Sequence, residues 1–279
     1  MLNGAKLMQI EKHDYYDENA IFYLSVQSVV EFGLRKLETF LKQLMEDKPD
    51  LTPTVIDNII SRCSNGNTHD LPIKSDDYKI LQKYPELLDR SIGTILSFMN
   101  YPKYQHEPFD EPIDIRNLDL LRPYVLFPYI QATSLTAIMP RKDAAKYYQD
   151  YVDSRTRKKR DPKKYDSDLN AFMDRAKIFY ATLRAHNVIF GVLAEGRIVM
   201  KVTKCMAADI MKEKNDPEFG YPVICYSDFP ATENANPNFR LTRTGTLAQG
   251  APYCDFCYHD TREVTTTDHP PKEFWENLK

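Results

Sequence analysis

The residues best suited to chemistry lie close together near the end of the sequence, between Arg240 and Asp260. Within twenty-one positions they bring together a thiol, a carboxylate, an imidazole and a guanidinium, carried by Cys254, Asp255, His259 and Arg243. Such a set combines a possible nucleophile with groups that can carry a proton or a positive charge. The alternative is that the cysteines are small buried hydrophobic residues.

A strand at residues 253–258 would decide which of these side chains meet. Because side chains alternate along a strand, one face would carry Cys254, Phe256 and Tyr258 and the other Asp255, Cys257 and His259. A zinc knuckle needs both sulfurs of a CxxC on one side, and the strand would separate them. No second CxxC is present, so we predict no metal, although Cys205 and Cys225 leave a four-sulfur zinc scaffold as an alternative.

The remaining cysteines and histidines are scattered. Five cysteines are an odd set in a chain too long to need disulfides, so we expect reduced thiols and a cytoplasmic location. His186 follows a predicted helix, where it either binds substrate or satisfies a terminal carbonyl. The histidines predicted to lie at the surface are His13, His69, His106 and His269, and Cys63 is expected to be core.

Several classes of function are disfavoured by motif and charge. With nine glycines, the sequence has no GxGxxG, GxxxxGK[ST], GxSxG or HExxH, so no cofactor is predicted. The net charge of −3 gives no general attraction to nucleic acid, and the basic run at residues 155–164 is interpreted as a solvated linker. The uncharged stretch at residues 123–140 is interrupted by polar residues and falls short of a membrane span.

Most of the elements that must position these groups are predicted to be helices. Apolar residues recur at three and four positions in six segments, which predicts helices at residues 21–45, 52–63, 75–99, 118–139, 143–155 and 167–185. The first hundred residues are therefore predicted to be helical. Prolines at positions 102, 108 and 112 mark a boundary, which divides the chain into a helical region, residues 1–110, and an α+β domain, residues 111–279.

The pattern changes to a strand period after residue 187. A hairpin is predicted from the strands at residues 188–193 and 198–203, and a helix is predicted at residues 206–214. Three more strands are predicted at residues 221–226, 239–247 and 253–258. The predicted fold class is α+β, with a helical N-terminal half and a C-terminal antiparallel sheet of about four to five strands packed by helices.

Four motifs give the segment from Arg141 to Asp260 a resemblance to a known family. They are the helix 142–148, a strand that ends in Cys205, Cys225 with Asp228 three positions later, and the run 243–250 that leads into Cys254-Asp255-Phe256. In this pattern the sequence resembles the L-2-amino-thiazoline-4-carboxylic acid hydrolase family. One departure is Cys257, where the resemblance would lead us to expect a basic residue.

The resemblance implies a hydrolase that opens a small heterocycle at an amidine-like carbon and gives a carbamoyl amino acid. It implies a cysteine nucleophile, Cys254 or Cys225, and an aspartate proton carrier, Asp228 or Asp255. Arg243 would clamp the substrate carboxylate, and the other substrate-binding residues would be Thr244, His186 and His259. In the alternative mechanism, the cysteines pack a core and a carboxylate activates water directly.

Two other functions compete with hydrolysis. The glycine followed by Cys-x-Phe is similar to small-molecule-binding domains of the four-vinyl-reductase type, in which a cysteine lines a ligand pocket. The second competitor is the zinc-stabilised scaffold. For the hydrolase we expect a small-molecule substrate, no nucleic-acid partner and no membrane partner, and the sequence leaves open whether the chain forms a homo-oligomer.

Overall fold

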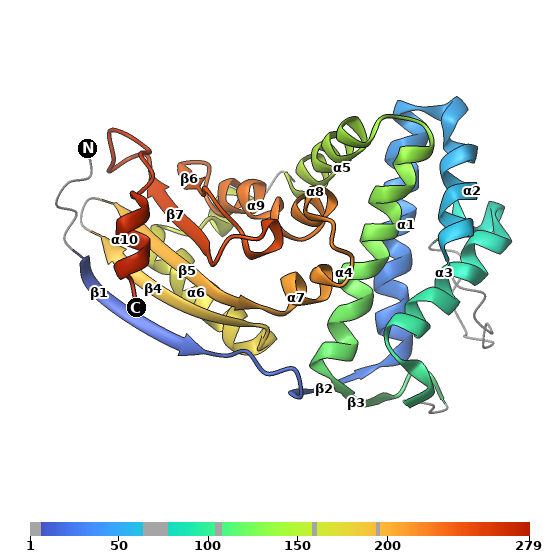
Figure 1. Ribbon diagram of the computed structural model, residues 1–279, viewed down its shortest axis with the longest axis horizontal. Coiled ribbons are helices and arrows are strands. Elements are labelled where there is room, and N and C mark those ends of the chain that lie inside the picture. Colours follow the sequence, from blue (N-terminus) through green and yellow to red (C-terminus); the bar gives the residue numbers. More distant parts are fainter. Residues whose placement is uncertain (1–6, 64–77, 104–107, 158–160, 194–195) are drawn as a thin grey trace. The chain divides into compact units, whose positions relative to one another are not determined.

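The computed structural model describes residues 7–63, 78–103, 108–157, 161–193 and 196–279. His69, His106 and residues 75–77, where a helix was predicted to begin, lie outside these ranges. The chain divides into two compact units, one of Met1–Glu18 with Val152–Lys279 and one of Asn19–Tyr151. These limits differ from the predicted boundary after residue 110, because the N-terminal strand joins the C-terminal sheet and residues 111–151 join the first helices (Figure 1).

The unit of residues 19–151 is mainly helical. It holds α1 (Val26–Asp47), α2 (Thr52–Arg62), α3 (Pro85–Phe98) and α4 (Asn117–Ser134), and α5 (Arg141–Thr156) runs from this unit into the other. One stripe of α1 is fully buried, from Val29 through Leu37 to Leu44. The three-and-four spacing therefore predicted this helix correctly from residue 26 onward.

The start of that helix was predicted wrongly. Residues Ile21–Ser25 form strand β2, which pairs antiparallel with β3 (Pro112–Arg116). Ser25 then caps α1, because its hydroxyl oxygen accepts a hydrogen bond from the Ser28 N–H at 3.2 Å. The β-branched and aromatic residues before the cap favour a strand, and the helical spacing begins only after it.

The other unit is built on a five-stranded antiparallel sheet of order β1-β4-β5-β7-β6. Its strands are β1 (Leu7–Asp14), β4 (His186–Leu193), β5 (Arg197–Cys205), β6 (Phe239–Thr242) and β7 (Cys254–Asp260). The α+β class and a sheet of five antiparallel strands are as predicted, and four of the strands, including the β4–β5 hairpin, lie in predicted segments. The prediction of a wholly helical N-terminus was wrong, because β1 pairs with β4 along the edge of the sheet.

The strand predicted at residues 221–226 is also wrong. This segment is η7 (Tyr221–Cys225), a short π-helix in which the Tyr226 N–H donates to the Tyr221 carbonyl at 3.0 Å. It follows α7 (Met206–Lys212) and α8 (Pro217–Gly220) and leads into α9 (Asp228–Ala235). Pro222 has no N–H to give to a strand ladder, whereas the first turn of a helix tolerates this loss.

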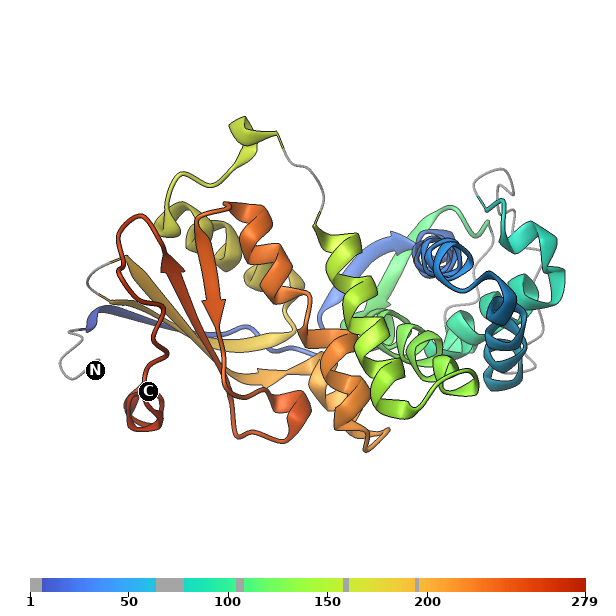
Figure 2. The same ribbon diagram turned by 90° about the horizontal axis from the view of Figure 1, so that it is seen from above.

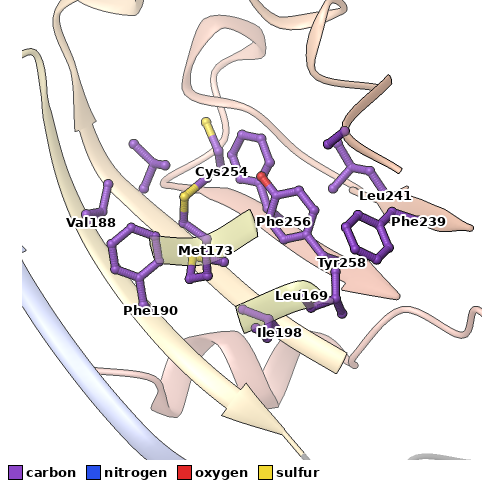
Figure 3. Close-up of a cluster of buried hydrophobic side chains, with 13 residues drawn as sticks. Leu169, Met173, Val188, Phe190, Ile198, Phe239, Leu241, Cys254, Phe256 and Tyr258 are labelled. Carbon is purple, nitrogen blue, oxygen red and sulfur yellow. The ribbon is translucent and has the colours of Figure 1, made fainter. Parts of the chain in front are cut away.

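The two faces of the sheet have different covers (Figure 2). The α6 face packs against α6 (Leu169–Leu183), and its core includes Phe190, Met200, Cys254 and Phe256 (Figure 3). The α10 face packs against α10 (Lys272–Asn277), and its core includes Val199, Cys257 and Trp275. Consecutive residues of β7 therefore enter different cores, as the strand period predicted.

The cover of the α10 face is held by a buried lysine. The Lys201 ammonium donates to the carbonyl oxygens of Trp275 at 2.6 Å and Leu278 at 2.8 Å. The Trp275 indole N–H donates to the Pro270 carbonyl at 3.1 Å. These bonds fix the C-terminal segment, residues 269–278, on the sheet.

Candidate functional site

The sheet divides the predicted site residues between its two faces. Arg243 and Cys254 lie on the α6 face, where the Arg243 guanidinium is 4.8 Å from the centre of the Phe256 ring. Thr244, Asp255 and His259 lie on the α10 face. Since β7 alternates, Cys254 and Asp255 cannot act on one substrate from the same side. The two groups are therefore described separately.

On the α6 face, Arg243 joins the segment that carries Cys225 and Asp228. Its Nη1 donates to Asp228 Oδ2 at 2.6 Å and its Nη2 donates to the Cys225 carbonyl at 3.0 Å. Only 2% of the Arg243 side chain is exposed. Its two terminal nitrogens are thus already engaged, so its role as a substrate clamp stays a prediction.

Three aromatic rings surround the same guanidinium. The rings of Tyr221, Phe229 and Phe256 have their centres 5.5, 5.0 and 4.8 Å from the guanidinium carbon. Aromatic faces attract a cation and exclude water from it. This cage and the ion pair hold Arg243 in one place beside Asp228.

The Asp228 carboxylate is more exposed than the arginine that binds it. Its side chain is 37% exposed, and within the described part of the chain its Oδ1 has no hydrogen-bond partner. Burial nevertheless raises the pKa of Asp228, against the opposing effect of Arg243. The carboxylate is therefore accessible, while burial still favours its protonated form.

The cysteines on this face are thiols, not thiolates. Burial raises the pKa of Cys254 to about 12 and of Cys205 to about 11, and it raises the pKa of Cys225 well above its usual range. Cys254 Sγ accepts one hydrogen bond, from the Leu247 N–H at 3.2 Å. At neutral pH all three sulfurs are protonated and are poor nucleophiles.

Three more polar groups, Tyr180, His186 and Tyr258, complete the α6-face cluster. By this name we mean Tyr180, His186, Cys205, Cys225, Asp228, Arg243, Cys254 and Tyr258. The His186 ring meets the Tyr180 ring edge to face at 4.9 Å, and its Nδ1 is buried without a hydrogen-bond partner in the described ranges. Burial raises the pKa of Tyr180, and the charges of Tyr258 and Asp228 raise it further. Tyr180 therefore keeps its hydroxyl proton.

On the α10 face, Asp255 is saturated with hydrogen bonds. Its Oδ1 accepts from the N–H groups of Thr244 and Gly245, both at 2.9 Å, and its Oδ2 accepts from the Thr244 hydroxyl and from His269 Nε2 at 3.1 Å. Burial alone would raise the pKa of Asp255, but these bonds outweigh it and lower the pKa. This carboxylate stays ionised and holds protein groups.

His269 was predicted wrongly to be a surface residue. Its side chain is 14% exposed, and its ring stacks on the Trp275 ring at 5.3 Å. Since the Asp255 carboxylate can only accept, His269 Nε2 carries the hydrogen, and with a neutral ring Nδ1 accepts from the Thr242 hydroxyl at 3.0 Å. Thr242 Oγ1 in turn accepts from His259 Nε2 at 2.9 Å. Four side chains thus form one hydrogen-bond chain.

The buried histidines make stability depend on pH. Burial lowers the pKa of both His186 and His259 to about 4, with Arg197 and His269 adding to the effect on His259. In the unfolded chain a histidine titrates near 6.5, so the unfolded state binds more protons between these values and stability falls as the pH drops from about 6.5 to about 4.

The substitution His259→Gln should weaken this dependence of stability on pH. The Gln amide keeps a donor toward Thr242 but does not titrate, so one histidine's share, up to about 1.4 kcal/mol per pH unit, is removed. The free energy of unfolding is measured with urea at pH 8, 6 and 5. At pH 8 the histidine is neutral in both states, so the difference there gives the cost of the substitution itself. An equal slope in variant and wild type would contradict the prediction.

Metal binding by the paired cysteines does not fit this geometry. Cys254 packs in the α6-face core and Cys257 in the α10-face core, so their sulfurs diverge as predicted. Within the described ranges, no group of three or more His, Cys, Asp and Glu side chains could hold a metal ion. In the same part of the chain, no helix is long and apolar enough to cross a bilayer.

Sequence reasoning missed Tyr180, Tyr221, Phe229 and His269. The tyrosines and phenylalanines are numerous, so spacing alone did not distinguish a cage from a core. His269 lies in a polar and proline-rich context, and its contacts with Trp275 and Asp255 bring it under cover. The α9 start and the end of β6, which face each other through Arg243 and Asp228, are fifteen residues apart.

The fold and the α6-face cluster define an α+β protein with a carboxylate–guanidinium pair among aromatic rings and thiols. The model of the L-2-amino-thiazoline-4-carboxylic acid hydrolase family matches residues 123–258 and confirms the predicted resemblance. The matched segment contains the whole α6-face cluster and ends before His269. Searches of curated proteins and of solved structures found no match.

Proposed function

We propose that this protein is a hydrolase that opens a C–N bond in a small ring, in a substrate such as a cyclic amidine or amide that bears a carboxylate. The proposal is supported by the family match at residues 123–258. The observation that carries it is Asp228, whose Oδ2 is held by Arg243 while its Oδ1 has no hydrogen-bond partner in the described chain and its side chain stays accessible.

In the proposed reaction Asp228 carries the proton. It accepts a proton from a water molecule as the water oxygen attacks the amidine-like carbon of the ring. The ring bond to the heteroatom then breaks, and Asp228 returns the proton to the leaving heteroatom, so one water is added in total. Burial raises the pKa of Asp228, which brings the proton affinity of the carboxylate closer to that of its partners.

The state of the thiols favours activated water over a covalent intermediate. A cysteine nucleophile must lose its proton, and burial raises the pKa of both Cys254 and Cys225. Among the described residues no histidine is hydrogen-bonded to either sulfur. The cysteines then serve as small apolar walls of the cluster.

The direct test is a substrate panel. Purified protein is incubated with 2-amino-thiazoline-4-carboxylate and with related cyclic amidines, ureas and diones, and the products are followed for a mass gain of one water. The metal content of the same sample is measured. Turnover supports the hydrolase, and binding without turnover across the panel supports the second candidate, a small-molecule-binding domain, which the apolar and aromatic lining of the α6-face cluster also suits.

Substituting the cysteines separates the two mechanisms. Cys225→Ser and Cys254→Ser should each keep turnover within about tenfold of wild type, because neither sulfur is asked to form a bond. Cys257→Ser, on the other face of the sheet, is the matched control. A loss of about a thousandfold in one variant, with the control unchanged, would establish a covalent step instead.

A further inference from the structure

Asp255 and Arg243 are linked by the turn between their strands. Arg243 points to the α6 face, and the next two residues give their N–H groups to Asp255 on the α10 face, both at 2.9 Å. The Thr244 hydroxyl donates to the same carboxylate. Asp255 is 4% exposed, so these bonds form away from water, where they are strong. The backbone immediately after Arg243 is thus fixed by a carboxylate on the opposite face.

The same turn also covers Cys254. After Gly245 the chain continues through the short helix η8 (Leu247–Gln249), and the Leu247 N–H donates to Cys254 Sγ at 3.2 Å. Thr246, between the two anchors, is fully buried. The segment 244–250 therefore lies over the α6-face cluster and is held from the α10 face.

Asp255 is itself held by the C-terminal segment. His269 Nε2 donates to Asp255 Oδ2 at 3.1 Å, and the His269 ring stacks on Trp275. Lys201 holds the main chain at Trp275. A continuous series of contacts thus runs from α10 through His269 and Asp255 to the turn after Arg243.

We infer that Asp255 and His269 are positioning residues: from the far side of the sheet they set the segment 244–250, and through it the Arg243–Asp228 pair. Neither residue reaches the α6-face cluster, so neither touches a substrate bound there. For its catalytic consequence the inference rests on the proposed function, whereas its structural part does not.

The structural part is tested by the reactivity of Cys254 toward iodoacetamide in the folded protein, followed by peptide mass analysis. Asp255→Asn removes the charge that all four hydrogen bonds share and places an NH2 donor opposite the Thr244 hydroxyl and His269 Nε2, both of which donate to Asp255 Oδ2. His269→Phe keeps the stacking on Trp275 but loses both nitrogens. Each should release the segment and speed alkylation of Cys254 about ten- to a hundredfold, since a hydrogen bond to a charged group is lost.

Two controls separate release of the segment from unfolding of the sheet. His269→Gln retains a donor for Asp255 and an acceptor for Thr242, so Cys254 should react within about twofold of wild type. Cys257, on the same strand but fully buried on the α10 face, should stay unreactive in every variant. If Cys257 speeds up together with Cys254, or if neither changes, the positioning role is overturned.

The catalytic part of the inference is tested by measuring turnover. In Asp255→Asn and His269→Phe a displaced Arg243 should lower the pKa of Asp228 less than in wild type, so the acid limb of the pH–rate profile should move to higher pH. An unshifted limb in a variant whose Cys254 has become reactive overturns this part. A wild-type protein that turns over no substrate refutes the proposed function, while the alkylation result still decides the structural part.

Discussion

Replacing Asp228→Asn should abolish most of the turnover, with a fall in kcat of about 10²- to 10⁴-fold, because the amide cannot take a proton from water. The fold should survive the change. Asn keeps an oxygen that can accept from Arg243 Nη1, and the Arg243 guanidinium stays bound to the Cys225 carbonyl and packed by the aromatic cage. The measurement is kcat on the substrate found in the panel, with thermal unfolding of the same sample.

The matched control for this variant is Asp174→Asn, an aspartate on α6 whose side chain is 75% exposed. It removes the same charge from the same unit and should leave kcat unchanged. If Asp228→Asn retained kcat within about threefold of wild type, Asp228 would not be the proton carrier. If it lost activity together with its cooperative unfolding, the loss would report the fold, and Asp228→Glu, which keeps a carboxylate, would then decide the role.

The alternation of side chains along a strand predicted the part of the site that lies on β7. From the sequence alone, Cys254 and Asp255 were placed on opposite faces of β7, and the packing of Cys254 with the α6-face core bears this out. The same alternation, carried past the end of β6, puts Arg243 with Cys254 and Thr244 with Asp255. The sheet, the hairpin and most helices followed from the same local rules.

The failures have a common physical cause in long-range contacts. β1 is a strand because residues far along the chain, in β4, offer it an edge, and nothing within its own eight residues requires this. The π-helix η7 likewise ends against a guanidinium that comes from another element. His269 is covered because Trp275 and Asp255 meet it from two sides. Spacing within one segment carries no information about such partners.

Removing the arginine of the ion pair should lower the stability of the protein. Arg243→Met leaves Asp228 among aromatic rings and thiols without its counter-ion, and breaking a buried pair from one side costs several kcal/mol. Because the Asp228 side chain is 37% exposed, solvent screens part of this, and we expect about 2–3 kcal/mol at pH 7. Arg175→Met breaks a surface pair with Asp166 (2.5 Å), and should cost about 1 kcal/mol or less.

The pH dependence of the Arg243→Met variant identifies the cause. Arg243 lowers the pKa of Asp228 against burial, so without Arg243 that pKa rises further above its unfolded value. A carboxyl with a raised folded pKa favours the folded state while it is protonated, and this contribution is lost as the pH rises from the unfolded pKa, near 3.9, through the folded one. The stability deficit of the variant should therefore be largest at pH 8 and shrink toward pH 4, as urea unfolding would show.

The double variant Asp228→Asn/Arg243→Met should be more stable than Arg243→Met at pH 8, because no charge is left buried without a partner. A deficit that is equal at all pH values, or a double variant with additive losses, would mean that the two side chains are not coupled.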